Sequence, residues 1–117
     1  MNKEQKRILH VDDDPQMRKF IAVILSDIAD VTPATSLQRA RELVKETRYD
    51  LVLVDSTLPD GSGSELINEL ARQDPSIPII VLSTHEISNT LDNVKQVFQK
   101  THFDKKNLTD AVRAQIR

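Results

Sequence analysis

Two short apolar runs in this chain each end in aspartate, and this feature constrains the fold more than any other. Residues 8–11 lead into Asp12, Asp13 and Asp14, and residues 51–54 lead into Asp55. The second run is apolar throughout, which is typical of a strand buried on both faces of a parallel sheet. Open α/β sheets bind their ligands outside the carboxyl ends of the strands. If the two strands are parallel neighbours, their carboxylates converge there and can bind a hard cation such as Mg²⁺.

Helix-like segments alternate with these strand-like runs, as in parallel α/β proteins. Apolar residues at three- and four-residue spacing predict helices that carry residues 17–28, 37–44, 66–71 and 108–116. Pro15 suits the first turn of the first of these helices. Ser36 can cap the second, and Ser62 or Ser64 the third.

Three further strands are predicted near Val31, at residues 79–82 and at Val97 and Phe98. Residues 86–94 are ambiguous, because Ile87, Leu91 and Val94 have a weak helical spacing among polar residues. Residues 59–63, with one proline and two glycines, predict a loop after the strand that ends at Asp55.

The composition predicts a single domain over residues 1–117. Hydrophobic residues make up 38% and charged residues 29%, as in globular proteins. The net charge of −2 gives no reason to expect direct binding to nucleic acid or to an anionic membrane. The chain has no cysteine, no signal-peptide pattern and no apolar stretch near the roughly 20 residues that span a bilayer. We therefore expect a cytoplasmic protein.

Four segments at predicted strand ends carry most of the polar residues of interest. They are His10-Val11-Asp12-Asp13-Asp14-Pro15, Val54-Asp55-Ser56-Thr57-Leu58-Pro59, Val81-Leu82-Ser83-Thr84 and Phe98-Gln99-Lys100. In this order, they resemble the receiver domains of two-component response regulators. The resemblance covers nearly the whole chain. It implies a doubly wound, flavodoxin-like α/β fold whose five parallel strands lie in the order 2-1-3-4-5.

The resemblance also assigns a phosphoacceptor and a metal site. Asp55 would accept a phosphoryl group from a histidine kinase or a histidine phosphotransfer protein. Asp12, Asp13 and Asp55 would bind Mg²⁺, together with the backbone carbonyl of Thr57. Without metal, clustered carboxylates repel one another, so we expect at least one raised pKa among them. His10, inside the first strand, is expected to be a packed core residue.

Ser83 and Lys100 are the other two site residues that the resemblance implies. The Ser83 hydroxyl would bond the incoming phosphoryl group, and Lys100 would pair with its oxygens. Phosphoryl transfer depends mainly on positioning and on neutralising charge, which a hydroxyl, an ammonium group and Mg²⁺ can supply. The protein would then catalyse its own phosphorylation and slow dephosphorylation without being a conventional enzyme.

Three features depart from the family pattern. Thr101 follows Lys100 where the family has proline in a cis peptide, so a trans bond is expected because a non-proline cis bond costs about 2.5–4 kcal/mol. Val97 occupies a position that is often aromatic, with Phe98 next to it. The segment from Thr84 to Gln99 is shorter than usual, which predicts a truncated or irregular fourth helix.

Two alternatives to a phosphorylated switch differ in class. One is a degenerate receiver that acts as a phosphorylation-independent docking or homodimerisation module. The other is a phosphohydrolase similar to haloacid dehalogenases, but residues 12–16 fail its Asp-x-Asp-x-Thr/Val motif. A nucleotide-binding enzyme is disfavoured because no glycine-rich phosphate loop follows any strand. The downstream protein partner is not indicated by the sequence.

Overall fold

The computed structural model describes residues 5–83, 94–100 and 104–116. The helices in these ranges are α1 (Pro15–Leu25), α2 (Leu37–Glu46), α3 (Gly63–Gln73) and α4 (Lys105–Ile116). The strands are β1 (Arg7–Val11), β2 (Asp30–Ala34), β3 (Leu51–Asp55), β4 (Thr57–Leu58), β5 (Gly61–Ser62), β6 (Ile79–Ser83) and β7 (Val94–Gln99).

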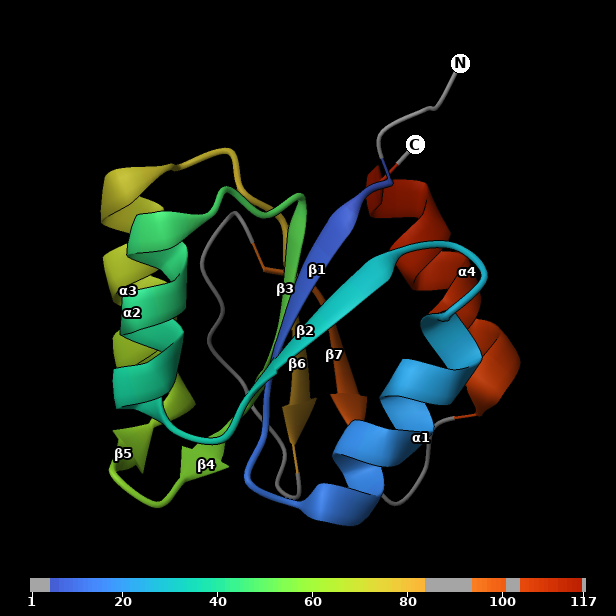
Figure 1. Cartoon of the computed structure of the whole chain (residues 1–117), viewed down its shortest axis with the longest axis horizontal. Helices are drawn as coiled ribbons and strands as arrows, with labels where there is room; N and C mark the ends of the chain where they lie inside the picture. Colours follow the sequence, from blue (N-terminus) through green and yellow to red (C-terminus); the bar gives the residue numbers. More distant parts are fainter. Residues whose placement is uncertain (1–4, 84–93, 101–103, 117) are drawn as a thin grey trace.

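Five of these strands form one parallel sheet in the order β2-β1-β3-β6-β7. Because β4 and β5 form a separate two-stranded hairpin, this order is the predicted 2-1-3-4-5 arrangement, and the predicted fold class is confirmed. All five strands run in the same direction, towards the lower part of Figure 1. Their carboxyl ends therefore share one edge of the sheet.

The sheet separates two helical layers and two cores (Figure 1). Helices α2 and α3 cover one face, where Val52 and Val54 of β3 are fully buried. Helices α1 and α4 cover the other face, where Leu51 and Leu53 of the same strand are fully buried. Burying each such side chain stabilises the fold by about 1.5–3 kcal/mol. The continuous apolar run in the sequence thus reflects a strand covered on both sides.

Polar residues fix the helix starts close to where the sequence predicts them. Pro15 begins α1, and the Asp14 side chain accepts a hydrogen bond from the Gln16 N–H at 3.0 Å. Ser36 caps α2. Ser62, rather than Ser64, caps α3 and forms a capping box with Glu65.

The structure corrects two details of the sequence prediction. Val94 begins β7, so the weak helical pattern that included it was wrong at that residue; the strand begins three residues before Val97. The loop predicted over residues 59–63 contains β5 and pairs with β4, with Thr57 opposite Ser62. β7 is half-buried and β5 has only two residues. The apolar periodicity that predicts strands is weakest in such segments.

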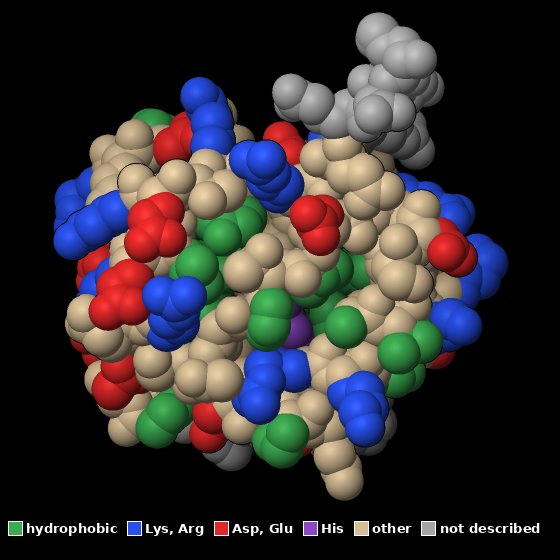
Figure 2. All heavy atoms as spheres, viewed as in Figure 1, with side chains coloured by type: hydrophobic (Ala, Val, Ile, Leu, Met, Phe, Trp, Pro, Cys, Tyr) green, Lys and Arg blue, Asp and Glu red, His purple; other side chains and the backbone are tan. Residues whose placement is uncertain are grey.

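Other expectations concern residues outside the described ranges. They include the irregular fourth helix, which would lie mainly within residues 84–93, and the trans bond that precedes Thr101. Among the described residues, no helix is long and apolar enough to cross a membrane. Acidic and basic side chains are interspersed on the face shown in Figure 2.

Candidate functional site: an acidic cluster at the carboxyl edge of the sheet

The backbone register brings the two aspartate-ended strands together. β1 pairs with β3 so that Val11 lies opposite Val54, and the next residues along the two strands are Asp12 and Asp55. Asp12, Asp13 and Asp55 can each offer a carboxylate oxygen such that all three lie within 4.8 Å of one another. The carboxyl groups predicted as metal ligands are therefore close enough to share one cation.

The three carboxylates differ in their environment. Asp12 is fully buried and Asp55 is 4% exposed, whereas Asp13 is exposed. The Asp12 backbone is held on both sides, because its N–H donates to the Ala34 carbonyl at 2.9 Å and its carbonyl accepts from Arg18 Nη1 at 3.0 Å. Two carboxylates thus belong to a rigid strand edge, and the third faces solvent.

Lys100 connects the two buried carboxylates. Its Nζ lies 2.9 Å from Asp12 Oδ2 and 3.1 Å from Asp55 Oδ2. Its backbone N–H donates to the Ser83 carbonyl at 2.7 Å, which anchors the end of β7 to the end of β6. Burial opposes the charge on Lys100, but the hydrogen bonds to Asp12 and Asp55 prevail and raise its pKa.

Lys100 also affects the ionisation of Asp12. Burial alone would raise the pKa of Asp12, but contacts with His10, the Asp14 N–H and Lys100 outweigh it, and the pKa falls to about 2. The raised pKa that is expected for at least one of the three carboxylates is therefore not at Asp12. Lys100, which directly follows β7, offsets the repulsion at that residue.

His10 lies directly beneath this site. It is fully buried, as predicted for a core residue, and its Nε2 is 3.7 Å from Asp12 Oδ2, beyond hydrogen-bond distance. Among the described residues, neither of its ring nitrogens has a hydrogen-bond partner. Lys100 Nζ is hydrogen-bonded to Asp12 Oδ1 at 3.1 Å and is in ion-pair contact with Oδ2 at 2.9 Å.

The net charge of the acidic cluster favours a bound cation. Three carboxylates face the Lys100 ammonium group, with the Arg18 guanidinium at the Asp12 carbonyl, so the ionised cluster keeps an excess of negative charge. A divalent cation would neutralise that excess, and Mg²⁺ prefers carboxylate and carbonyl oxygens. The residues present therefore fit the cation that the sequence predicts.

Ser83 and Thr57 lie next to the cluster. Ser83 ends β6, is fully buried, and accepts a hydrogen bond at Oγ from Ser56 Oγ at 3.0 Å. Thr57 begins β4, two residues beyond Asp55, so its backbone lies in the segment that directly follows β3. The structure thus gathers the predicted site residues at one edge of the sheet.

Two residues that the sequence prediction did not assign to the site support the segment after Asp55. A Cβ atom on Gly63 would lie 2.3 Å from the Asp55 carbonyl oxygen, so only glycine fits there. Asp60 accepts hydrogen bonds from the backbone N–H groups of Leu37 at 2.9 Å and Gln38 at 3.0 Å, which ties the hairpin to the start of α2. The sequence prediction treats Gly63 only as a loop residue. It contains no signal that relates Asp60 to the start of α2.

Val97, which occupies the often aromatic position, and its neighbour Phe98 pack on opposite faces of the sheet. Val97 packs against the core under α2 and α3, and Phe98 packs against the core under α1 and α4. Because side chains alternate along a strand, Phe98 cannot take the position of Val97 without a shift in register.

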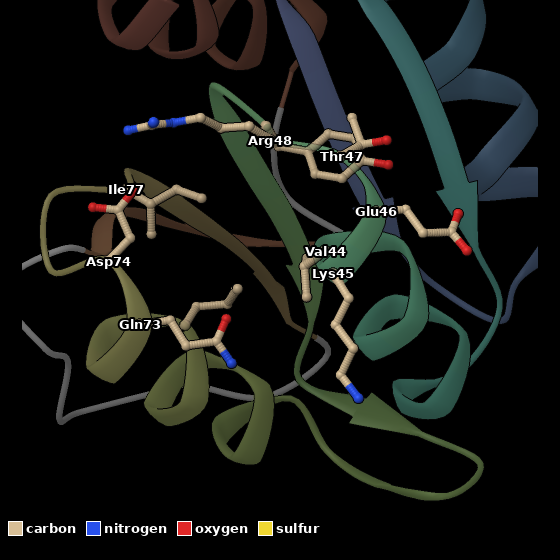
Figure 3. Close-up of a pocket in the computed structure, with 10 residues that line it drawn as sticks. Val44, Lys45, Glu46, Thr47, Arg48, Gln73, Asp74 and Ile77 are labelled. Carbon is tan, nitrogen blue, oxygen red and sulfur yellow. The ribbon is translucent and has the colours of Figure 1, made fainter.

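A cavity of about 500 Å³ lies at the opposite edge of the sheet, near the amino ends of β3 and β6 (Figure 3). The pKa of Asp74 at its rim is lowered, chiefly by the hydrogen bond from the Ser76 hydroxyl and to a smaller extent by the charge of Arg48. The cavity is separate from the acidic cluster. Its lining residues are Val44, Lys45, Glu46, Thr47, Arg48, Tyr49, Leu70, Gln73, Asp74 and Ile77.

A parallel sheet with an acidic cluster and a lysine at its carboxyl edge is the architecture of a receiver domain, and the comparisons agree. The family model of the response regulator receiver domain matches residues 8–117. The chain belongs to the family of response regulator receiver domains.

Individual relatives and structures are similar to this chain over most of its length. The response regulator protein PilR of Pseudomonas aeruginosa is 31% identical over 101 residues, which are 86% of this chain and 22% of PilR. The transcriptional regulatory protein KdpE of Staphylococcus aureus is 32% identical over 114 residues, which are 97% of this chain and 49% of KdpE. The chain thus spans less than half the length of either relative.

A solved structure gives a closer geometric comparison. The response regulator TrrA of Thermotoga maritima, in complex with Mg²⁺ and beryllium fluoride, superposes with a TM-score of 0.85 at 26% identity. The match covers 95% of this chain and 99% of that one.

Proposed function

We propose that this domain is a phosphorylation switch: Asp55 accepts a phosphoryl group from a histidine kinase or a histidine phosphotransfer protein, and the product alters a surface that a downstream protein binds. The observation that carries the proposal is the joint placement of Asp12, Asp13 and Asp55 within 4.8 Å, with Lys100 hydrogen-bonded to two of them.

The chemistry follows from the roles of these groups. An Asp55 oxygen attacks phosphorus, a new O–P bond forms, and the N–P bond of the donor phosphohistidine breaks, with the electron pair returning to the imidazole. Lys100, already bonded to Asp55 Oδ2, would neutralise charge on the phosphoryl oxygens, and the Ser83 hydroxyl would donate to one of them. Positioning and electrostatics of this kind supply most of the catalysis in phosphoryl transfer.

Asp12, Asp13, Asp55 and the Thr57 carbonyl would bind Mg²⁺. When bound, the ion would add charge neutralisation at the phosphoryl oxygens. That TrrA was solved with Mg²⁺ and a beryllium fluoride group supports this part of the proposal.

The partners and location are part of the same proposal. Helix α1 follows the acidic cluster directly and exposes Phe20 by 40% and Val23 by 67%, which offers an apolar surface beside the site for a phosphodonor protein. A cytoplasmic location rests on the family of two-component regulators.

The proposal is tested by an amide-resolved NMR titration with Mg²⁺ and beryllium fluoride, a mimic of the aspartyl phosphate. We expect saturable shifts around Asp55, Ser83 and Lys100 that are absent in Asp55→Asn. The matched control is Asp30→Asn, because Asp30 is exposed at the amino end of β2, the opposite edge of the sheet.

Mg²⁺ binding without any response to beryllium fluoride would favour the degenerate docking module. Shifts that persist unchanged in Asp55→Asn would rule out Asp55 as the phosphoacceptor.

A further inference from the structure

Ser56, the residue directly after the proposed phosphoacceptor, is hydrogen-bonded to the hydroxyl of Ser83. The distance between the two Oγ atoms is 3.0 Å. β3 and β6 are paired neighbours with Asp55 opposite Leu82, and the Ser56 N–H donates to the Leu82 carbonyl at 3.1 Å. The two serines are therefore the next residues along two adjacent, registered strands.

The alternation of side chains places this serine pair on one particular face of the sheet. Val54 and Val81 belong to the core under α2 and α3, and the residues two positions further along the two strands are Ser56 and Ser83. Leu53 belongs to the core under α1 and α4, and two positions on from it is Asp55. The pleat therefore directs the serine pair and the Asp55 carboxylate to opposite faces.

The hydroxyl of Ser83 consequently has two alternative positions. In this structure its Oγ accepts a hydrogen bond from Ser56 Oγ. Rotation of the Ser83 side chain towards the carboxylate side, where it would donate to a phosphoryl group on Asp55, would break that hydrogen bond. Ser83 is fully buried, so each hydrogen bond that it makes changes the free-energy difference between the two positions of its hydroxyl. Ser56 is half-buried, so water can replace Ser83 as its partner.

We propose that Ser56 is a positioning residue that holds the Ser83 hydroxyl in its resting orientation and so sets the threshold for the switch. This inference rests on the proposed function of Asp55 and adds a residue that acts through Ser83 without contacting the phosphoryl group. A net hydrogen bond between neutral groups changes an equilibrium by about two- to twelvefold. Removing the Ser56 hydroxyl should therefore favour the activated position by a factor in that range.

The test measures the apparent affinity for beryllium fluoride at saturating Mg²⁺ in the whole chain. Ser56→Ala should bind about two- to twelvefold more tightly than the original protein. Ser56→Thr, which keeps the hydroxyl, should retain the original affinity. In a Ser83→Ala background, the Ser56→Ala change should have no effect, because the group on which it acts is gone.

A second measurement does not depend on the fluoride complex. The Lys100 N–H donates to the Ser83 carbonyl at 2.7 Å, so its amide resonance reports on Ser83. Without Mg²⁺ or fluoride, Ser56→Ala should shift this resonance towards its chemical shift in the complex of the original protein with Mg²⁺ and beryllium fluoride. Ser56→Thr should leave it near its original position.

Several results would overturn the inference. Weaker or unchanged fluoride binding in Ser56→Ala would do so, as would an equal effect in the Ser83→Ala background. If the original protein shows no Asp55-dependent response to beryllium fluoride, the proposed function is wrong, and the role of Ser56 is wrong as well. If that response is present and Ser56→Ala does not alter it, only the role of Ser56 fails.

Discussion

The Nζ atom of Lys100 lies 3.1 Å from Oδ2 of Asp55, although 45 positions separate the two residues in the chain. The same ammonium group contacts fully buried Asp12. In metal-free buffer, Lys100→Met should lower the free energy of unfolding by about 3 kcal/mol, because two buried carboxylates lose their cation. Added Mg²⁺ should restore part of the loss. Urea unfolding with and without Mg²⁺ measures both effects.

The matched control for this change is Lys106→Met. Lys106 pairs with Asp110 on α4, but its side chain is 83% exposed, and we expect no measurable change in stability. Equal losses in the two variants would mean that Lys100 has no special relationship with the acidic cluster.

Asp13 provides a test of the metal site that leaves the core intact. Because Mg²⁺ would bind only the folded chain, it should stabilise the protein by about 1.4 kcal/mol at ten times its dissociation constant. Asp13 is exposed, so Asp13→Asn should remove most of this stabilisation while changing the metal-free stability little. Thermal unfolding over a Mg²⁺ series is the measurement. Asp27→Asn, an exposed change beyond the far end of α1, should keep the full Mg²⁺ effect.

Gly63 should tolerate no larger residue. A Cβ atom there would lie 2.3 Å from the Asp55 carbonyl oxygen and 2.9 Å from Val54 Cγ1, so Gly63→Ala must displace the end of β3. We expect a loss of about 1–3 kcal/mol, typical of overpacking, although alanine usually stabilises a helix relative to glycine. Urea unfolding tests this, with Ser64→Ala as the control at the next position of α3. A Gly63→Ala protein as stable as the original would show that the contact can relax freely.

The link between Asp60 and α2 predicts a dependence on pH. The N–H groups of Leu37 and Gln38 favour the ionised form and lower the pKa of Asp60 below its ordinary value. The folded pKa is thus lower than the unfolded one, so the stabilisation is complete above about pH 4–5 and is lost as the pH falls further. The original protein should be more stable than Asp60→Asn at pH 7, and the difference should shrink in acid. Urea midpoints between about pH 7 and 3 would reveal this; a difference that widens in acid contradicts the assignment.

The sequence predicts the sheet and the acidic edge well because both depend on strong local patterns. Because β3 is buried on both faces, its side chains are apolar on both sides, which gives the unbroken apolar run of residues 51–54. Pro15 and Ser36 begin helices for local backbone reasons that require no knowledge of the rest of the chain. The placement of Asp12 beside Asp55 then follows from parallel pairing of β1 with β3.

The remaining details depend on contacts between distant residues. The low pKa of Asp12 requires Lys100 at 2.9 Å, and the sequence gives the order of these residues but not their distance. The hydrogen bond between Ser56 and Ser83 depends on the register of β3 against β6, which apolar residues on both faces specify only weakly. Val94 was misread because β7 is only half-buried and lacks a clear period.

The position of β7 at the edge of the sheet has a consequence for local opening. Among the strands that the structure describes, β7 pairs with β6 alone, and it is less buried than β3 or β6. Lys100, the cation of the acidic cluster, directly follows it. Detachment of β7 would leave three carboxylates facing one another without that cation. Hydrogen exchange at the amides of β7 therefore serves as a readout of the charge on the cluster. It should become faster when Mg²⁺ binds, because the ion then supplies part of the positive charge that the cluster loses when Lys100 leaves.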